Sequence, residues 1–192
     1  DGGRADRPFF LMMSYYTVHR PLQAPDSIIT YYEEKIAERE FENPPFVVEQ
    51  NPDAPAYEET SWEEKQAWGR NEALFAQDGF NDRRAIRVKR RQDHPVFAAM
   101  VRYLDYSVGR LLAKLEEEGL EENTIVLFYS DNGGLASAYP GAATSEAPLR
   151  AGKGWLYEDG IRVPMIVRWP GRVEAGPVNE TVFNTPDLYP TL

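Results

Sequence analysis

The stretch that decides the fold is TIVLFYSDNGG, residues 124–134. Its first seven residues form a continuous β-branched, aliphatic and aromatic run, which predicts a strand buried inside a sheet. The run gives way to Asp131 and Asn132, a carboxylate and an amide oxygen followed by two glycines. Ligands of open α/β sheets gather beyond the carboxyl ends of the strands. The stretch therefore predicts a buried strand with polar groups at its functional end.

Working outward, two further apolar runs predict strands at residues 8–16 and 163–169. Pro164 is tolerable near the start of the second of these. Between residues 93 and 119, apolar side chains recur at helical spacing, and Gly119 suits a left-handed C-terminal cap. Strand, helix and strand in this order favour an α/β fold with a largely parallel central sheet flanked by helices.

Two shorter helices are also expected. Asp26 is suited to cap a helix that continues into the charged residues before position 41, and Asn184 begins a second helical pattern at the end of the sequence. His94 precedes the long helix, so we expect it to be an N-terminal hydrogen-bond partner there.

Composition excludes several classes of protein. The 192 residues suit one domain, with 31 acidic against 21 basic residues and a formal net charge of −10. This acidic balance argues against a nucleic-acid binder. No cysteine is present, which excludes a disulfide scaffold, a cysteine-ligated metal site and a cysteine nucleophile within these residues. No apolar run approaches the roughly 18 residues of a membrane span.

Residues 41–92 are the least regular part of the sequence. Pro-containing dipeptides interrupt the first half, an acidic stretch follows, and basic residues from Arg83 to Arg91 end it. Several aromatic side chains argue against simple disorder. We interpret the segment as a variable, irregular insertion with one or two helices, which either faces substrate or covers the core, with its charges in solvent.

Three sites carry candidate chemistry. Asp131 and Asn132 offer two hard oxygen ligands to a divalent cation, although Asp-Asn-Gly-Gly is also a good turn sequence and on these residues alone the turn is favoured. His19 follows the first predicted strand and could donate a proton near neutral pH. Lys153 lies between two glycines, where its ammonium group can approach an anion without obstruction.

These three sites occur together, in this order, in local sequences that resemble the sulfatases of the alkaline-phosphatase-like superfamily. The likeness covers most of the chain outside residues 41–92. It runs through residues 7–11 and 19–25, 95–100 and 104–110, 123–126 and 130–134, 149–158 and 160–164.

The resemblance implies a role for each residue. His19 matches the histidine that contacts the sulfate and helps to protonate the leaving alcohol. Asp131 and Asn132 match ligands of a divalent cation, usually calcium, and Lys153 matches the lysine that binds a sulfate oxygen. Arg150 is a candidate substrate contact, with a structural role at least as well supported. Sulfate-ester cleavage needs positive charge around the sulfuryl oxygens and a proton for the leaving oxygen.

The family's nucleophile is a formylglycine made from Cys or Ser in a Cys/Ser-x-Pro/Ala-x-Arg signature. These residues contain no such signature, and the resemblance places it, with further metal ligands, before Asp1. Residues 1–192 are therefore expected to be part of a sulfatase catalytic domain, incomplete at both ends, that lacks the nucleophile portion and a C-terminal portion. We expect residues 1–192 alone to have no catalytic activity.

The resemblance predicts a sulfuric ester hydrolase of arylsulfatase type that acts on a sulfated carbohydrate or an aryl sulfate. A phosphoric or phosphonic ester hydrolase of the same superfamily, and a degenerate non-catalytic binder of sulfated glycans, remain alternatives. Relatives are exported to the periplasm or outside the cell, although no signal sequence is present here. Ala151 and Asp159 stand at positions where glycines are common in the family. Lys153 lies in a loop of residues 148–157, called the lysine loop below, and we expect Glu158 and Arg162 to pair and to brace it.

Overall fold

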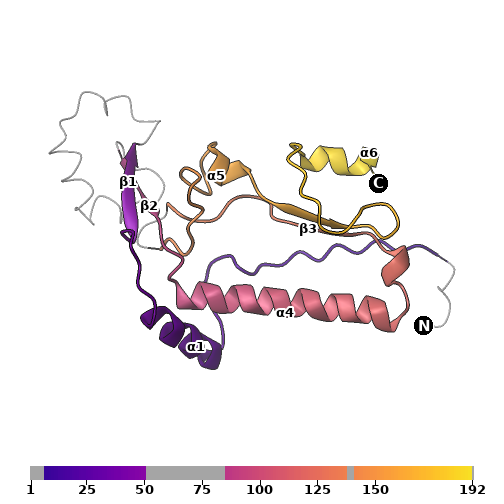
Figure 1. The fold of residues 1–192 in the computed structure, drawn as a ribbon, viewed down its shortest axis with the longest axis horizontal. Coiled ribbons are helices and arrows are strands. Elements are labelled where there is room, and N and C mark those ends of the chain that lie inside the picture. Colours follow the sequence, from indigo (N-terminus) through magenta and orange to yellow (C-terminus); the bar gives the residue numbers. More distant parts are fainter. Residues whose placement is uncertain (1–6, 51–84, 138–140, 192) are drawn as a thin grey trace.

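A computed structural model describes residues 7–50, 85–137 and 141–191 (Figure 1). The described elements are, in chain order, α1 (Asp26–Ala37), β1 (Phe46–Gln50), β2 (Ala85–Lys89), α4 (Pro95–Glu117), the 3₁₀ turn η1 (Glu121–Asn123), β3 (Val126–Tyr129), α5 (Glu158–Ile161), β4 (Met165–Arg168), the 3₁₀ turn η2 (Thr185–Asp187) and α6 (Leu188–Thr191).

The long helix α4 confirms the prediction from helical spacing, and both of its ends have local causes. His94 is its N-cap and accepts a hydrogen bond from the Phe97 N–H at 3.3 Å, as expected for an N-terminal partner. Pro95 follows at the first helical position, where its missing N–H costs nothing. Gly119, just beyond the helix, has φ +65°. Helix α1 packs against α4, but its N-cap is Pro25 rather than Asp26.

The segments 124–130 and 163–169 do not form part of the largely parallel central sheet that we expected. Both segments form strands, β3 and β4, but they pair antiparallel, with Val126 opposite Arg168 and Tyr129 opposite Met165. A continuous apolar run is the mark of a buried strand, and it carries no information about the direction of the neighbouring strand. The described residues therefore form an α/β arrangement of helices and two small antiparallel sheets, without the full central sheet that we expected.

The predicted strand at residues 8–16 is also wrong in the described part of the chain. These residues are extended but unpaired, and Phe10, for example, is 86% exposed. Figure 1 shows the segment running alongside α4, and the Ser107 hydroxyl donates to Tyr15 Oη at 3.1 Å. A strand needs partners for its backbone N–H and C=O groups, and side-chain pattern alone does not supply them.

Part of the segment predicted as irregular is ordered. Strands β1 and β2 form an antiparallel hairpin, with Phe46 opposite Lys89. The Lys89 N–H donates to the Ala136 carbonyl at 2.8 Å, which joins the hairpin to the chain that follows Asp131 and Asn132. The helices expected within residues 51–84 lie outside the described residues. Lys89 is buried and pairs with Asp93, so this basic stretch is not simply a solvated face.

A small core forms where the hairpin meets the later loops. It contains Val88 from β2, Ala136, and Ala151 with Trp155 from the lysine loop, and Val47 and Tyr157 pack against it. Near the end of the sequence, Asn184 and Asp187 form a reciprocal capping box at η2, which confirms the helix start predicted there. Across the described ranges, no helix is long and apolar enough to cross a bilayer.

Candidate functional site

The candidate site is built on the turn that follows β3. The Asp131 side chain is exposed and Asn132 is half-buried. The Ser130 hydroxyl donates to the Asn132 carbonyl at 2.9 Å, so the segment is a turn, as its composition favours. The turn and metal-ligand interpretations are compatible, because the turn itself holds the two side chains next to each other beyond the strand.

Backbone hydrogen bonds join this turn to the lysine loop. The Lys153 N–H donates to the Gly134 carbonyl at 2.8 Å, and the Gly133 N–H donates to the Gly160 carbonyl at 3.0 Å. Lys153 is half-buried. Because both bonds are between main-chain atoms, the two loops form one unit whatever their side chains do. The structure therefore brings Lys153 together with the Asp131–Asn132 turn.

The fit between the two loops is close. A Cβ atom on Gly133 would fall 1.6 Å from the Asp159 carbonyl oxygen, so only glycine fits at this position. The indole Nε1–H of Trp155 donates to Ser137 Oγ at 3.0 Å, and both side chains are buried. This side-chain bond ties the far end of the lysine loop to the chain that leaves the Asp131–Asn132 turn.

His19 lies on a different turn and is exposed. Its Nδ1 is 2.9 Å from the Arg20 carbonyl oxygen and 3.2 Å from Tyr16 Oη. An Nδ1–H that donates to this carbonyl leaves Nε2 available for an outside group.

Among the described residues, His19 is connected to the other candidates through its neighbour Arg20. The guanidinium group of its neighbour Arg20 lies against Gly141, where a Cβ atom would be 1.2 Å from Nη2. Gly141 belongs to the loop that follows the Asp131–Asn132 turn. Within the described ranges no hydrogen bond or ion pair joins His19 to Asp131 or Lys153, so the structure brings its turn near the site without placing it in direct contact.

Asp131 and Asn132 supply hard oxygen ligands, which suit calcium or magnesium. Calcium takes about 6–8 oxygen ligands, and these two side chains can supply only a few of them. In the described part of the chain, no group of three or more His, Cys, Asp or Glu side chains could hold a metal ion. The pair therefore fits a divalent cation in chemistry, as an incomplete set of ligands.

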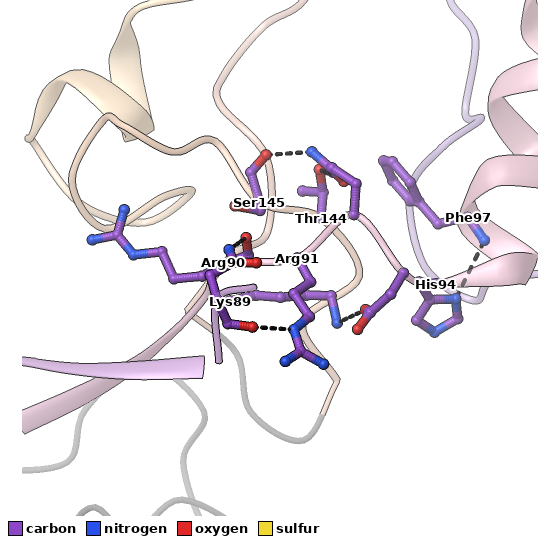
Figure 2. Close-up of polar contacts among 10 residues, drawn as sticks. Lys89, Arg90, Arg91, His94, Phe97, Thr144 and Ser145 are labelled. Carbon is purple, nitrogen blue, oxygen red and sulfur yellow. Dashed lines mark hydrogen bonds and ion pairs between the residues drawn. The ribbon is translucent and has the colours of Figure 1, made fainter. Parts of the chain in front are cut away.

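The structure contains a polar cluster that the sequence did not predict. Figure 2 shows it between the end of β2, the start of α4 and the loop that carries Thr144 and Ser145. The Gln92 side-chain amide donates to the Ser145 carbonyl, and the Thr144 hydroxyl donates to Gln92 Oε1 at 3.2 Å. Thr144 and Ser145 are buried. The available signal was the position of Gln92 between the charged residues Arg91 and Asp93, three residues after the end of β2.

Arg150 is held on the hairpin side of the lysine loop. Its Nε is 3.6 Å from Glu49 Oε2, and its guanidinium group lies 4.2 Å from the centre of the Tyr157 ring. Glu49 also pairs with Arg90 through Oε1, at 2.7 Å. These contacts support the structural role that the sequence left open for Arg150. Glu49 itself was not among the predicted residues, although it interrupts the apolar run of β1.

Asp159 is the most unusual titratable group of the site. It is 1% exposed, and neither carboxylate oxygen has a hydrogen-bond partner among the residues that the structure describes. Burial raises the pKa of this carboxyl group to about 6, with a further contribution from the negative charges of Glu146 and Glu49, while Arg90 opposes the shift. Burial also raises the pKa of Glu146, against the effect of hydrogen bonds from Thr144 and the Gly134 N–H.

Glu158 and Arg162 form the predicted ion pair, with Arg162 Nη1 2.9 Å from Glu158 Oε2. Both side chains are largely exposed. Exposed pairs contribute little to stability, so this pair is at most a weak brace for the lysine loop.

Comparison with known proteins gives a consistent set of relatives. The Sulfatase family model matches residues 2–192. A Sulfatase from Formosa agariphila is 45% identical over 105 residues, which are 50% of this chain and 18% of that protein. The dog N-acetylgalactosamine-6-sulfatase is 41% identical over 91 residues, 47% of this chain and 17% of the relative. Human Arylsulfatase H is 42% identical over 96 residues, 48% of this chain and 17% of the relative.

The matched part is therefore less than a fifth of the length of each of these three relatives. The solved structure of Ps i-CgsB in complex with k-i-k-neocarrahexaose aligns with 79% of this chain and 29% of its own chain. The identity is 26% and the TM-score is 0.40.

Proposed function

Because the chain belongs to the sulfatase family, we propose that it forms part of the catalytic domain of an enzyme that hydrolyses sulfate esters. Its substrate would be a sulfated carbohydrate or an aryl sulfate, and relatives named N-acetylgalactosamine-6-sulfatase and Arylsulfatase H support this class. One observation carries the proposal more than any other. The Lys153 N–H bonds to the Gly134 carbonyl, and this main-chain bond joins the loop that carries the candidate cation to the turn that carries the candidate oxygen ligands.

In this proposal Lys153 and His19 have separate tasks. Lys153 binds a sulfuryl oxygen, and at 4 Å with an effective dielectric of 20 this contact has a Coulomb energy of about 4 kcal/mol before desolvation. His19 holds Nδ1 against the Arg20 carbonyl, so that Nε2 is the atom that carries a proton to the leaving alcohol oxygen. For both tasks, the turn that carries His19 has to face the lysine loop.

Asp131 and Asn132 would hold a divalent cation, calcium by family resemblance, which supplies positive charge beside the sulfuryl oxygens when bound. The proposal also includes a formylglycine nucleophile contributed by residues outside these 192, and export to the periplasm or the cell exterior. Both of these rest on the resemblance. The side chains of this chain would bind and orient the sulfate group and protonate the leaving group.

The test compares paired aryl sulfate and aryl phosphate substrates, with the complete polypeptide that carries these residues. We expect hydrolysis mainly of the sulfate ester, and Lys153→Met should lower kcat/KM by about 100-fold or more, as for the loss of one oxyanion-stabilising group. Lys114→Met on the exposed face of α4 is the matched control and should leave kcat/KM unchanged.

Dominant hydrolysis of the phosphate ester would overturn the proposal in favour of a phosphoric ester hydrolase. Binding of a sulfated glycan without turnover of either ester would support the non-catalytic binder instead. An unchanged kcat/KM in Lys153→Met would remove the lysine loop from the mechanism.

A further inference from the structure

Besides the core contacts of Val47 and Val88, the β1–β2 hairpin reaches the lysine loop through a charged side chain. Glu49 projects from β1, and its side chain is 13% exposed. Its two carboxylate oxygens have different partners. Oε1 accepts a hydrogen bond from Arg90 at 2.7 Å, and Oε2 lies 3.6 Å from Arg150 Nε. Glu49 therefore links the end of the hairpin to the loop that carries Lys153.

Arg150 contacts both Glu49 and a second residue of the lysine loop, Tyr157. Its guanidinium group lies 4.2 Å from the centre of the Tyr157 ring, in the geometry of a cation–π interaction. Arg150 and Tyr157 flank the segment that contains Lys153, one on each side. Ala151, next to Arg150, is fully buried in the core that Tyr157 packs against. A shift of Arg150 would therefore move both ends of the loop.

The geometry points to Glu49 as a positioning residue for Lys153, and we infer that it acts through Arg150 and Tyr157. The inference rests on the proposed function, because it concerns how the lysine loop presents its cation to an anionic substrate. It also gives the hairpin of residues 46–50 and 85–89 a share in substrate binding. The Glu49 side chain is 13% exposed against 44% for that of Arg150, so the pair is partly buried and is screened less than a fully exposed pair.

The matched variants are Glu49→Gln, Glu49→Ala and Arg90→Gln in the complete polypeptide. Glu49→Gln keeps the shape of the side chain and weakens the ion pair with Arg150. Arg90→Gln removes only the ion pair between Arg90 and Glu49 Oε1, and it leaves the Glu49–Arg150 pair in place. Glu117→Gln, in an exposed pair on α4, controls for the loss of one acidic charge.

With an aryl sulfate, we expect Glu49→Ala to raise KM about fivefold, and Glu49→Gln by less, while kcat changes less than about twofold. This is the pattern of weakened binding without a change in the chemical step. Arg90→Gln should lower the melting temperature without raising KM, and Glu117→Gln should change neither. A KM that rises equally in Arg90→Gln would overturn the inference, because the effect would then follow hairpin stability.

Amide hydrogen exchange gives a readout that does not depend on activity. The Lys153 and Trp155 N–H groups bond to the Gly134 and Gly152 carbonyls. Glu49→Ala should speed their exchange about tenfold while β2 amides keep their protection. Wild-type exchange in this loop would overturn the inference. If the wild type hydrolysed no sulfate ester, the proposed function would fail, and the exchange experiment would still decide the role of Glu49.

Discussion

Asp159 is the residue at which burial and charge conflict most directly. Its pKa is about 6 in the folded protein against 3.8 for an unperturbed group, so the folded state binds the proton more tightly than the unfolded state. The stabilisation that comes from this tighter proton binding by Asp159 is fully present below about pH 4 and is lost as the pH rises through 6. At pH 7.5 the ionised group should cost about 3 kcal/mol relative to a neutral one.

We therefore expect Asp159→Asn to melt at a higher temperature than the wild type at pH 7.5, with a gain that shrinks as the pH falls to 4.5. Thermal unfolding of the complete polypeptide across this range measures the difference. Asp105→Asn, on an exposed position of α4, should show no such trend. A gain that is independent of pH would show that the Asp159 carboxyl group does not titrate between these states.

At the scale of elements, the junction between the Asp131–Asn132 turn and the lysine loop depends on Gly133. We expect Gly133→Ala to destabilise the protein by at least about 1–3 kcal/mol, because the new Cβ would collide with the Asp159 carbonyl oxygen, which is backbone and cannot move alone. The same change at Gly109, inside α4, where no described atom outside the neighbouring helix backbone lies within 4 Å of the added Cβ, should stabilise by about 0.5–1 kcal/mol. Chemical denaturation of both variants gives the comparison, and equal effects would contradict it.

The hydrogen bond between Trp155 and Ser137 helps to hold the lysine loop, and its strength can be measured. A double-mutant cycle of Trp155→Phe and Ser137→Ala should give a coupling energy of about 0.5–1.5 kcal/mol, as for a neutral hydrogen bond. Each single variant should cost more than its share of this coupling, because the partner is left buried and unpaired. A coupling energy near zero would mean that the two side chains do not bond in solution.

These elements also mark what the sequence could predict. Local signals predicted the helix α4, its His94 and Gly119 ends, and the Asn184 capping box, because neighbours along the chain determine such features. The strands β3 and β4 were also located correctly. Their direction, and the unpaired state of residues 8–16, depend on which segments meet in space, and no local pattern carries that information.

The same division holds for the candidate site. Local sequence marked Asp131, Asn132 and Lys153 only as candidates, and the family resemblance was needed to propose roles for them. Glu49 and Gln92 were missed because each acts on a residue that is distant in sequence, 101 positions away for the Glu49–Arg150 pair and 53 for Gln92 and Ser145. Only folding the hairpin onto the later loops shows that residues 41–50 and 85–92 support the site.

At the scale of the whole molecule, the oxygen ligands of Asp131 and Asn132 make sense only as part of a larger set. In the complete polypeptide, saturating calcium should raise the melting temperature, since a ligand at about 100 times its Kd stabilises by about 2.7 kcal/mol. Asp131→Ala should remove most of this rise and weaken the calcium dependence of sulfate-ester hydrolysis. Asp105→Asn should keep both. A calcium-induced rise that persists in Asp131→Ala would show that the cation binds elsewhere, because a carboxylate that coordinates it cannot be lost without weakening its binding.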